Sequence, residues 1–154
     1  MACNRLLRKI GLVLLLGMIA ACNGKPSVTP TSGAAPRSGV TSMQSVELKP
    51  GTGDAVTAGK IAVVQYTGWL YESSAPDNKG KQFDSSRTAG QPFRFPLGTG
   101  QVIKGWDQGV LGMKIGESRR LIIPAELAYG DSGAAGVIPP GATLVFDIDL
   151  VAIE

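Results

Sequence analysis

The chain has 154 residues, with 15 lysines and arginines, 12 aspartates and glutamates, two cysteines and no histidine. The absence of histidine excludes Ser-His-Asp and Cys-His catalytic groups and any histidine-bound metal, and two thiols cannot complete a four-cysteine zinc site. We therefore expect no metal, and any catalysis must use carboxylates, hydroxyls, lysines or the shape and polarity of a pocket.

The first 21 residues have the pattern of a secretory signal. Three basic residues (Arg5, Arg8 and Lys9) precede an apolar run at 10–21, which is shorter than the ~20 residues that a membrane-spanning helix needs. The tetrad 19–22, Ile-Ala-Ala-Cys, resembles a bacterial lipoprotein signal in which Cys22 becomes the lipidated first residue. An ordinary signal peptide with a chance cysteine is the alternative.

Lipidation at Cys22 predicts a protein anchored by lipid to the bacterial cell envelope, facing the periplasm or exposed at the surface. Asn23 after the cysteine favours the outer over the inner membrane. Cleavage removes three basic residues and no acidic one, which leaves 12 of each and a net charge of zero. The excess positive charge thus belongs to the signal, and we expect no nucleic-acid partner.

Residues 23–44 differ in composition from the rest of the chain. Of these 22 residues, 13 are glycine, proline, serine or threonine, and none is aromatic. Such a segment buries too little surface to offset its ordering entropy, so residues 22–44 are predicted to be the lipidated cysteine and a flexible tether. A linker with no role beyond spacing is the alternative. Residues 45–154 are predicted to form one domain with a single core.

Three segments of the domain have strand patterns. Residues 60–71 and 119–123 are rich in β-branched and apolar side chains, and residues 143–153 alternate in polarity. In the last segment, Asp147 and Asp149 are predicted to lie on one face. The opposite, buried face is predicted to carry Leu144, Phe146, Ile148, Leu150 and Ala152. The alternation predicts a half-buried antiparallel strand.

One short helix is predicted over residues 104–112. Trp106, Val110 and Met113 are spaced to share one helical face, which would be buried. Three glycines in this segment each cost about 1 kcal/mol relative to alanine, so the helix needs tertiary packing to persist. Several strands and one helix predict an α+β domain in which a curved antiparallel sheet covers the helix.

Seven of the nine aromatic residues of the domain stand mainly where predicted elements begin or end. They are Tyr66, Phe83, Phe93, Phe95, Trp106, Tyr129 and Phe146. If these side chains converge, they form an apolar pocket with a few polar tips, the usual form of a small-ligand site. The alternative, which periodicity alone favours, is that they only pack the core.

Three strings resemble the FKBP-type peptidyl-prolyl cis-trans isomerases. They are VVQYTGWL, KQFDSSRTAGQPFRFPLGTGQVIKGWDQGVLGMKIGESRRLIIPAELAYG and GVIPPGATLVFDIDL, in family order from about Val46 to the C-terminus. The resemblance implies a five- or six-stranded antiparallel sheet wrapped around one short helix. It also implies isomerase activity on folding envelope or exported proteins, with proline-containing clients, possible macrolide inhibitors and no cofactor.

The resemblance also implies roles for single residues. Trp106 matches the indole floor under the substrate proline, the Ile103 N–H and the Tyr129 hydroxyl match donors to carbonyls, and Asp84 matches the pocket carboxylate. The pocket wall is matched by Tyr66, Phe83, Phe95 (with Phe93 less closely), Val102, Ile103 and Phe146, and the IPP motif contributes Ile138. For Phe93 and Val102 the alternative role is packing alone. For Asp84 the alternative role is to hold its own loop in place.

Residues 72–82 form a longer segment than in the smallest relatives, and we expect it beside the pocket rim. The chain has neither the large loop insertion of chaperone-type relatives nor the long helical extension of dimeric ones, so a monomer is expected. One alternative function is a module that binds proline segments or macrolides with incidental turnover. Another is a structural lipoprotein with an idle pocket.

Overall fold

The computed structural model describes residues 39–134 and 136–154. The predicted signal, Cys22 and most of the predicted tether lie outside the described residues. Within the described part, no helix is long and apolar enough to cross a membrane.

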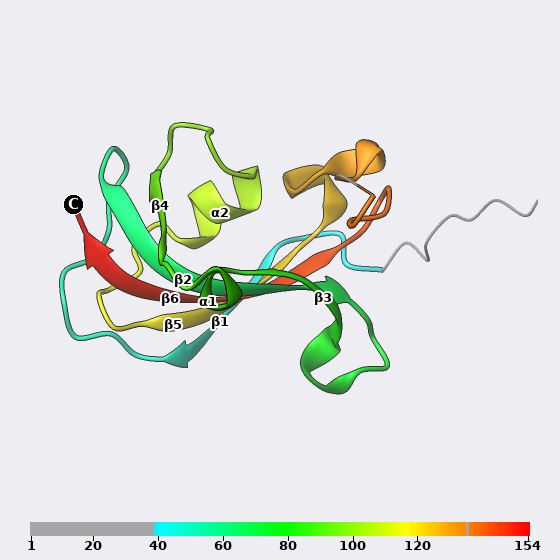
Figure 1. The fold of residues 1–154 in the computed structure, drawn as a ribbon, viewed down its shortest axis with the longest axis horizontal. Coiled ribbons are helices and arrows are strands. Elements are labelled where there is room, and N and C mark those ends of the chain that lie inside the picture. The colour runs from blue at the N-terminus through cyan, green and yellow to red at the C-terminus, as the bar shows by residue number, and fades with distance from the viewer. Residues whose placement is uncertain (1–38, 135) are drawn as a thin grey trace, which may run out of the picture. The chain divides into compact units, whose positions relative to one another are not determined.

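Six antiparallel strands form one sheet (Figure 1). They are β1 (Gln44–Lys49), β2 (Ile61–Tyr71), β3 (Lys79–Ser85), β4 (Phe93–Pro96), β5 (Ser118–Ile123) and β6 (Leu144–Ile153). The hydrogen-bonded order is β1-β5-β6-β2-β3, and β4 pairs with β2 beside this path. Central strands β6 and β2 together supply eight of the 18 buried hydrophobic residues in the described part of the chain. The predicted α+β class and antiparallel sheet are confirmed.

Two short helices accompany the sheet, where the sequence predicted one. They are α1 (Ser86–Ala89) and α2 (Lys104–Gly109), and three 3-10 turns cover η1 (Pro76–Asn78), η2 (Ala125–Leu127) and η3 (Gly130–Ser132). Helix α1 is a single turn that begins where the Ser85 side chain accepts the Arg87 N–H, 3.3 Å away, and ends at Gly90 with φ 74°. One turn has no apolar periodicity, so the pattern that predicted α2 could not reveal α1.

Helix α2 lies against the sheet through two of its glycines. A Cβ built on Gly105 would lie 2.5 Å from Ile123 Cγ2, and one on Gly109 would overlap the Leu121 side chain. The glycines that weaken the helix therefore let its backbone approach β5. As predicted, Trp106, Val110 and Met113 are all buried, although the helix ends at Gly109 and not at 112. Tertiary packing thus outweighs the poor helix propensity.

The predicted alternation of β6 holds as far as Leu150. Val63 then pairs with Ala152 and Val64 with Leu150, so Val151 is skipped and forms a bulge. The bulge moves Ile153 to the core face, and Val151 is 48% exposed. The prediction that Ala152 shares the face of Leu150 is therefore wrong.

The folded domain begins slightly earlier than the sequence predicted. Strand β1 starts at Gln44, which pairs with Ile122, and Met43 packs against the core. Both residues fall in the predicted tether. Their side chains carry too weak a pattern to mark a strand, because β1 is an edge strand that is exposed along its whole length.

Candidate active site

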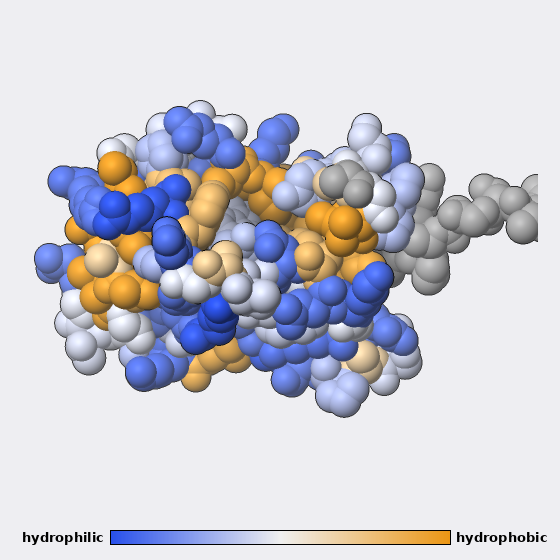
Figure 2. All heavy atoms as spheres, in the orientation of Figure 1, coloured by the Kyte–Doolittle hydropathy of each residue, from blue (hydrophilic) through white to orange (hydrophobic). Residues whose placement is uncertain are grey.

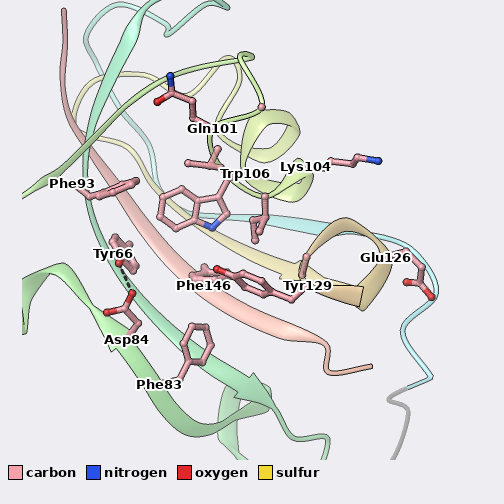
Figure 3. A pocket seen from close by; sticks show the side chains of 14 residues that line it. Tyr66, Phe83, Asp84, Phe93, Gln101, Lys104, Trp106, Glu126, Tyr129 and Phe146 are labelled. Atoms are coloured by element: carbon pink, nitrogen blue, oxygen red, sulfur yellow. Dashed lines mark hydrogen bonds between the residues drawn. The ribbon is translucent and has the colours of Figure 1, made fainter. Parts of the chain in front are cut away.

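A pocket of about 680 Å³ opens between the sheet, the start of α2 and the turn η2 (Figure 3). Its lining comes from β2, β3, β4, β6, the segment leading into α2, and the segment at η2. The lining residues are Tyr66, Phe83, Asp84, Phe93, Gly100, Gln101, Val102, Ile103, Lys104, Trp106, Glu126, Ala128, Tyr129 and Phe146. Segments distant in sequence thus converge on one cavity.

Trp106 is the centre of an aromatic cluster at this pocket. Its ring centroid lies 4.9 Å from that of Tyr66, 5.3 Å from Phe146 and 5.5 Å from Phe95. The Tyr66 and Phe146 rings meet the indole nearly edge-on, an arrangement that aromatic pairs prefer. The indole is 5% exposed, so its neighbours hold it rigidly as one wall of the pocket.

Nine of the residues that the resemblance singled out line this pocket. They are Tyr66, Phe83, Asp84, Phe93, Val102, Ile103, Trp106, Tyr129 and Phe146. The aromatic residues therefore both pack the core and form a pocket, so the two alternatives drawn from the sequence hold together.

The structure reverses the expectation that Phe95 lines the pocket wall more closely than Phe93. Phe93 lines the pocket and is 39% exposed, whereas Phe95 is 2% exposed and is not a lining residue. The two rings stack with centroids 5.7 Å apart, and Phe95 also packs behind Trp106. Residues two apart share a strand face, so the sequence could not tell which ring covers the other.

Ile138 also lies outside the pocket lining. It is 6% exposed in the core, and its backbone exchanges two hydrogen bonds of 3.0 Å with Ala134. A Cβ on Gly133, whose φ is +63°, would clash with the Ile138 carbonyl. Ile138 thus shapes the loop after Tyr129 and is not among the residues that line the pocket.

Several lining residues were not predicted from the sequence. They are Gly100, Gln101, Lys104, Glu126 and Ala128. Lys104 and Glu126 are exposed and lie on the side of the pocket away from Asp84 (Figure 3). Their nearness in sequence to Ile103 and Tyr129 was the one available signal, because exposed charged residues have no distinctive pattern.

A hydrogen bond joins Tyr66 to Asp84 at the edge of the pocket. The Tyr66 hydroxyl donates to Asp84 Oδ2 over 2.5 Å, and Asp84 Oδ1 accepts the Ser85 N–H over 2.8 Å. Burial, then the hydrogen bond and charge of Asp84, raise the pKa of Tyr66 well above its ordinary value. Burial and the Asp84 charge also raise the pKa of Tyr129. Both hydroxyls therefore stay protonated near neutral pH.

The segment leading into α2 is held by one carboxylate. Asp107 accepts the Gly98 N–H over 2.8 Å and the Gly100 N–H over 3.0 Å, which fixes the chain just before Val102 and Ile103. Within 39–134 and 136–154, the Ile103 N–H and the Tyr129 hydroxyl donate to no protein acceptor. In the same part of the chain, the buried Trp106 Nε1 also has no partner. The Ile103 N–H and the Tyr129 hydroxyl are thus the donors available to a ligand in the pocket.

Gly68 on β2 provides room for two pocket rings. A Cβ at this position would lie 2.7 Å from Phe83 Cζ and 2.8 Å from Phe146 Cε1. These two rings meet edge-on with centroids 5.6 Å apart. A larger residue at 68 would displace one or both of these rings. In the described ranges, no group of three acidic or cysteine side chains is placed to hold a metal ion.

Residues 53–151 match the family model described as FKBP-type peptidyl-prolyl cis-trans isomerase. The chain belongs to this family. An FK506-binding protein of Neisseria meningitidis serogroup B is 49% identical over 107 residues, which cover 70% of this chain and 92% of that protein. FK506-binding protein 2B of Rhizopus delemar is 53% identical over 97 residues, or 63% of this chain and 44% of the relative.

The FKBP fold is also found among solved structures. The crystal structure of AtFKBP13 superposes with a TM-score of 0.64 and 39% identity, covering 73% of this chain and 93% of that one. The chain thus spans most of some FKBP relatives and less than half the length of the Rhizopus protein. The matched region, 53–151, contains every lining residue of the pocket.

Proposed function

We propose that this FKBP domain catalyses cis-trans isomerisation of X–Pro peptide bonds in folding envelope or exported proteins. The observation that carries the proposal is the pocket built around Trp106. Its lining includes the Ile103 N–H and the Tyr129 hydroxyl, which have no partner in the part of the chain that the structure describes. Membership of the isomerase family supports the same reaction.

The physics of the reaction suits such a pocket. Rotation about the amide breaks its resonance, at a barrier of ~18–20 kcal/mol, and no bond is cut and no proton is transferred. The twisted amide is less polar than the planar one, so an apolar cavity with little water binds the transition state better than the ground state. A thousandfold acceleration requires about 4 kcal/mol of such differential binding. Differential binding of this kind needs no histidine, so this chain can supply it.

The pocket residues have distinct parts in this mechanism. Trp106 offers a rigid face for the pyrrolidine ring, and Tyr66 and Phe146 pack against that indole. The Ile103 N–H and the Tyr129 hydroxyl are donors for carbonyls that flank the proline. Asp84 orients the Tyr66 hydroxyl and fixes the start of the α1 turn through Ser85. All of these groups bind and position the substrate.

A protease-coupled assay with a panel of peptides that differ in the residue before proline tests the proposal. We expect the protein to accelerate isomerisation of several members of the panel. Uncatalysed isomerisation takes about 10–100 s at 25 °C, so catalysis at micromolar protein is readily distinguished. Rates equal to those in buffer for the whole panel would contradict the proposal.

The same cavity supports binding of macrolides. The Neisseria and Rhizopus relatives are both named for binding FK506. We expect FK506 to compete with a proline peptide for the pocket. Titration calorimetry with and without the peptide measures this competition, and independent binding of the two would contradict it.

The sequence pattern at 19–22 supports anchoring of the domain to the cell envelope through lipid on Cys22, with the outer membrane favoured by Asn23. We expect Cys22→Ser to move the protein from the membrane fraction to the soluble fraction. A variant that stays with the membranes would contradict lipid anchoring. We also expect a monomer, which light scattering on the soluble variant checks.

A further inference from the structure

A second hollow of about 920 Å³ lies at the end of β2, where the described chain begins. Its walls are residues 39–42 and Gln44, the segment from Leu70 to Ser74, Gly80 and Lys81 on β3, and the segment around Pro139 to Thr143. No residue of the segment 72–82, expected beside the pocket rim, lines the first pocket. Five of its residues line this second hollow instead.

The two cavities follow one another along the same strands. On β3, Phe83 lines the first and Lys81 the second. On β2, Gly68 faces the Phe83 and Phe146 rings of the first, and Leu70, two residues on, lines the second. Residues two apart on a strand lie roughly 7 Å apart. The two hollows therefore follow one another along β2 and β3, where register shifts interrupt the pairing of these strands.

The loop after Tyr129 runs beside both cavities as well. It leaves the first pocket at Tyr129 and reaches the second at Pro139 and Ala142. The Gly141 N–H donates to the Gly130 carbonyl over 2.9 Å, which fixes the two ends of this loop together. A polypeptide that leaves the first pocket on this side therefore meets the second hollow within a few residues.

The chemistry of the second hollow suits an apolar side chain. Leu70, Val40, Pro139 and Ala142 are half-buried and supply apolar surface, and the polar Ser73 and Lys81 at its rim are exposed. Figure 2 shows apolar surface beside the point where the described chain begins. The Ser74 hydroxyl donates to Glu72 over 3.0 Å and so holds one rim carboxylate. Apolar surface with a few polar groups, here including the buried Thr143, is the usual form of a ligand site.

We propose that the second hollow is a subsite for the client polypeptide, which takes an apolar side chain about three residues from the proline. An extended chain rises about 3.3 Å per residue. Two or three residues of a bound polypeptide therefore span the distance between strand positions that line the first pocket and those that line the second hollow. The subsite rests on the proposed isomerase function and adds a preference for sequence beyond the prolyl bond. It would favour unfolded clients over isolated X–Pro dipeptides.

A leucine scan tests the subsite. Peptides contain one Ala-Pro bond in a serine-glycine chain, and a single leucine is moved from about one to six residues away on either side. We expect kcat/KM to peak when the leucine is about three residues from proline on one side, by about tenfold and through KM. Equal rates at every position would overturn the subsite, whereas absence of turnover with every peptide would overturn the isomerase function itself.

A pocket-filling variant separates the subsite from general effects. Ser73→Trp places a large ring at the rim of the second hollow, and Thr52→Trp, on an exposed loop outside both hollows, is the matched control. We expect Ser73→Trp to abolish the leucine peak and to leave turnover of a leucine-free peptide unchanged, with Thr52→Trp like the wild type. Thermal melts establish that both variants fold. A peak that persists in a folded Ser73→Trp protein would overturn the subsite.

Discussion

The Tyr66 hydroxyl donates to the Asp84 carboxylate across the β2–β3 edge of the pocket, with 2.5 Å between the two oxygens. The other carboxylate oxygen accepts the Ser85 N–H, so one side chain both holds its loop and orients a pocket hydroxyl. The two roles considered for Asp84 from sequence therefore coexist in one geometry. The pair stands beside the Trp106 floor, because the Tyr66 ring packs edge-on against that indole.

Tyr66→Phe removes this hydrogen bond and keeps the ring. We expect a loss of about 1 kcal/mol in the free energy of unfolding, because Asp84 is exposed and the net value of such a bond is modest. We expect kcat/KM to fall severalfold, since the pocket edge is less well fixed. Urea denaturation and the isomerase assay measure the two effects. A variant equal to the wild type in both would show that the hydrogen bond has no part in the site.

The activity is expected to be flat between about pH 5 and 8. No histidine titrates in this range, and the pKa values of Tyr66 and Tyr129 are raised further from it. A pH profile of kcat/KM with a proline peptide that has no titratable side chain checks this. A sigmoid within this window that Asp84→Asn abolishes would instead require a strongly perturbed carboxylate in the mechanism.

Stability is expected to fall above about pH 10. Unfolded tyrosines lose their protons near their ordinary pKa of about 10, while the folded protein keeps those of Tyr66 and Tyr129. The unfolded state then binds fewer protons, so raising the pH favours unfolding. Thermal melts from pH 8 to 11.5 should show a smaller decline for Tyr66→Phe than for the wild type. Equal declines would contradict the raised pKa of Tyr66 in the folded state.

Gly68→Ala is expected to distort the pocket by displacing the aromatic rings that pack over this position. The added methyl group lies within 3 Å of the Phe83 and Phe146 rings, so one or both of these pocket-lining rings must shift. Overpacking of this kind costs about 1–3 kcal/mol of stability, and the displaced rings should lower kcat/KM. Gly39→Ala is the matched control, because nothing lies within 4 Å of its added Cβ. Full activity in Gly68→Ala would show that the rings tolerate displacement.

Gly109→Ala is expected to destabilise the domain although alanine is the better helix former. Alanine would gain about 1 kcal/mol of helix propensity, but its methyl group overlaps Leu121 and forces α2 away from β5. Gln108→Ala, at an exposed position of the same helix, should change stability little. Urea denaturation of both variants compares the two effects. A more stable Gly109→Ala would mean that propensity outweighs packing at this contact.

The sequence predicts those elements of the domain in which apolar residues recur at a regular spacing and so form one buried face. Alternation predicts β6 up to Leu150, and helical spacing places Trp106, Val110 and Met113 in the core. It does not predict the bulge at Val151, because a skipped residue depends on how β2 pairs with β6. Nor does it predict that Phe93 and not Phe95 faces the pocket, since both residues share a strand face.

The charged rim of the pocket was missed for a different reason. Lys104 and Glu126 are exposed residues on separate elements, and only the folded chain brings them to one cavity. The aromatic pocket residues could be named from the sequence because the family motifs mark them. The structure adds their mutual geometry, with Trp106 held by its aromatic neighbours.

Exchange NMR at equilibrium tests the central claim most directly, because it distinguishes turnover from binding alone. The protein is added at about one part in a hundred to a peptide with one Ala-Pro bond, and cis-trans exchange cross-peaks are recorded. We expect the wild-type protein to produce these cross-peaks and Trp106→Ala, checked for folding by a thermal melt, to produce far weaker ones. Peptide shifts that indicate binding, without any exchange, would contradict catalysis and leave a module that only binds proline segments.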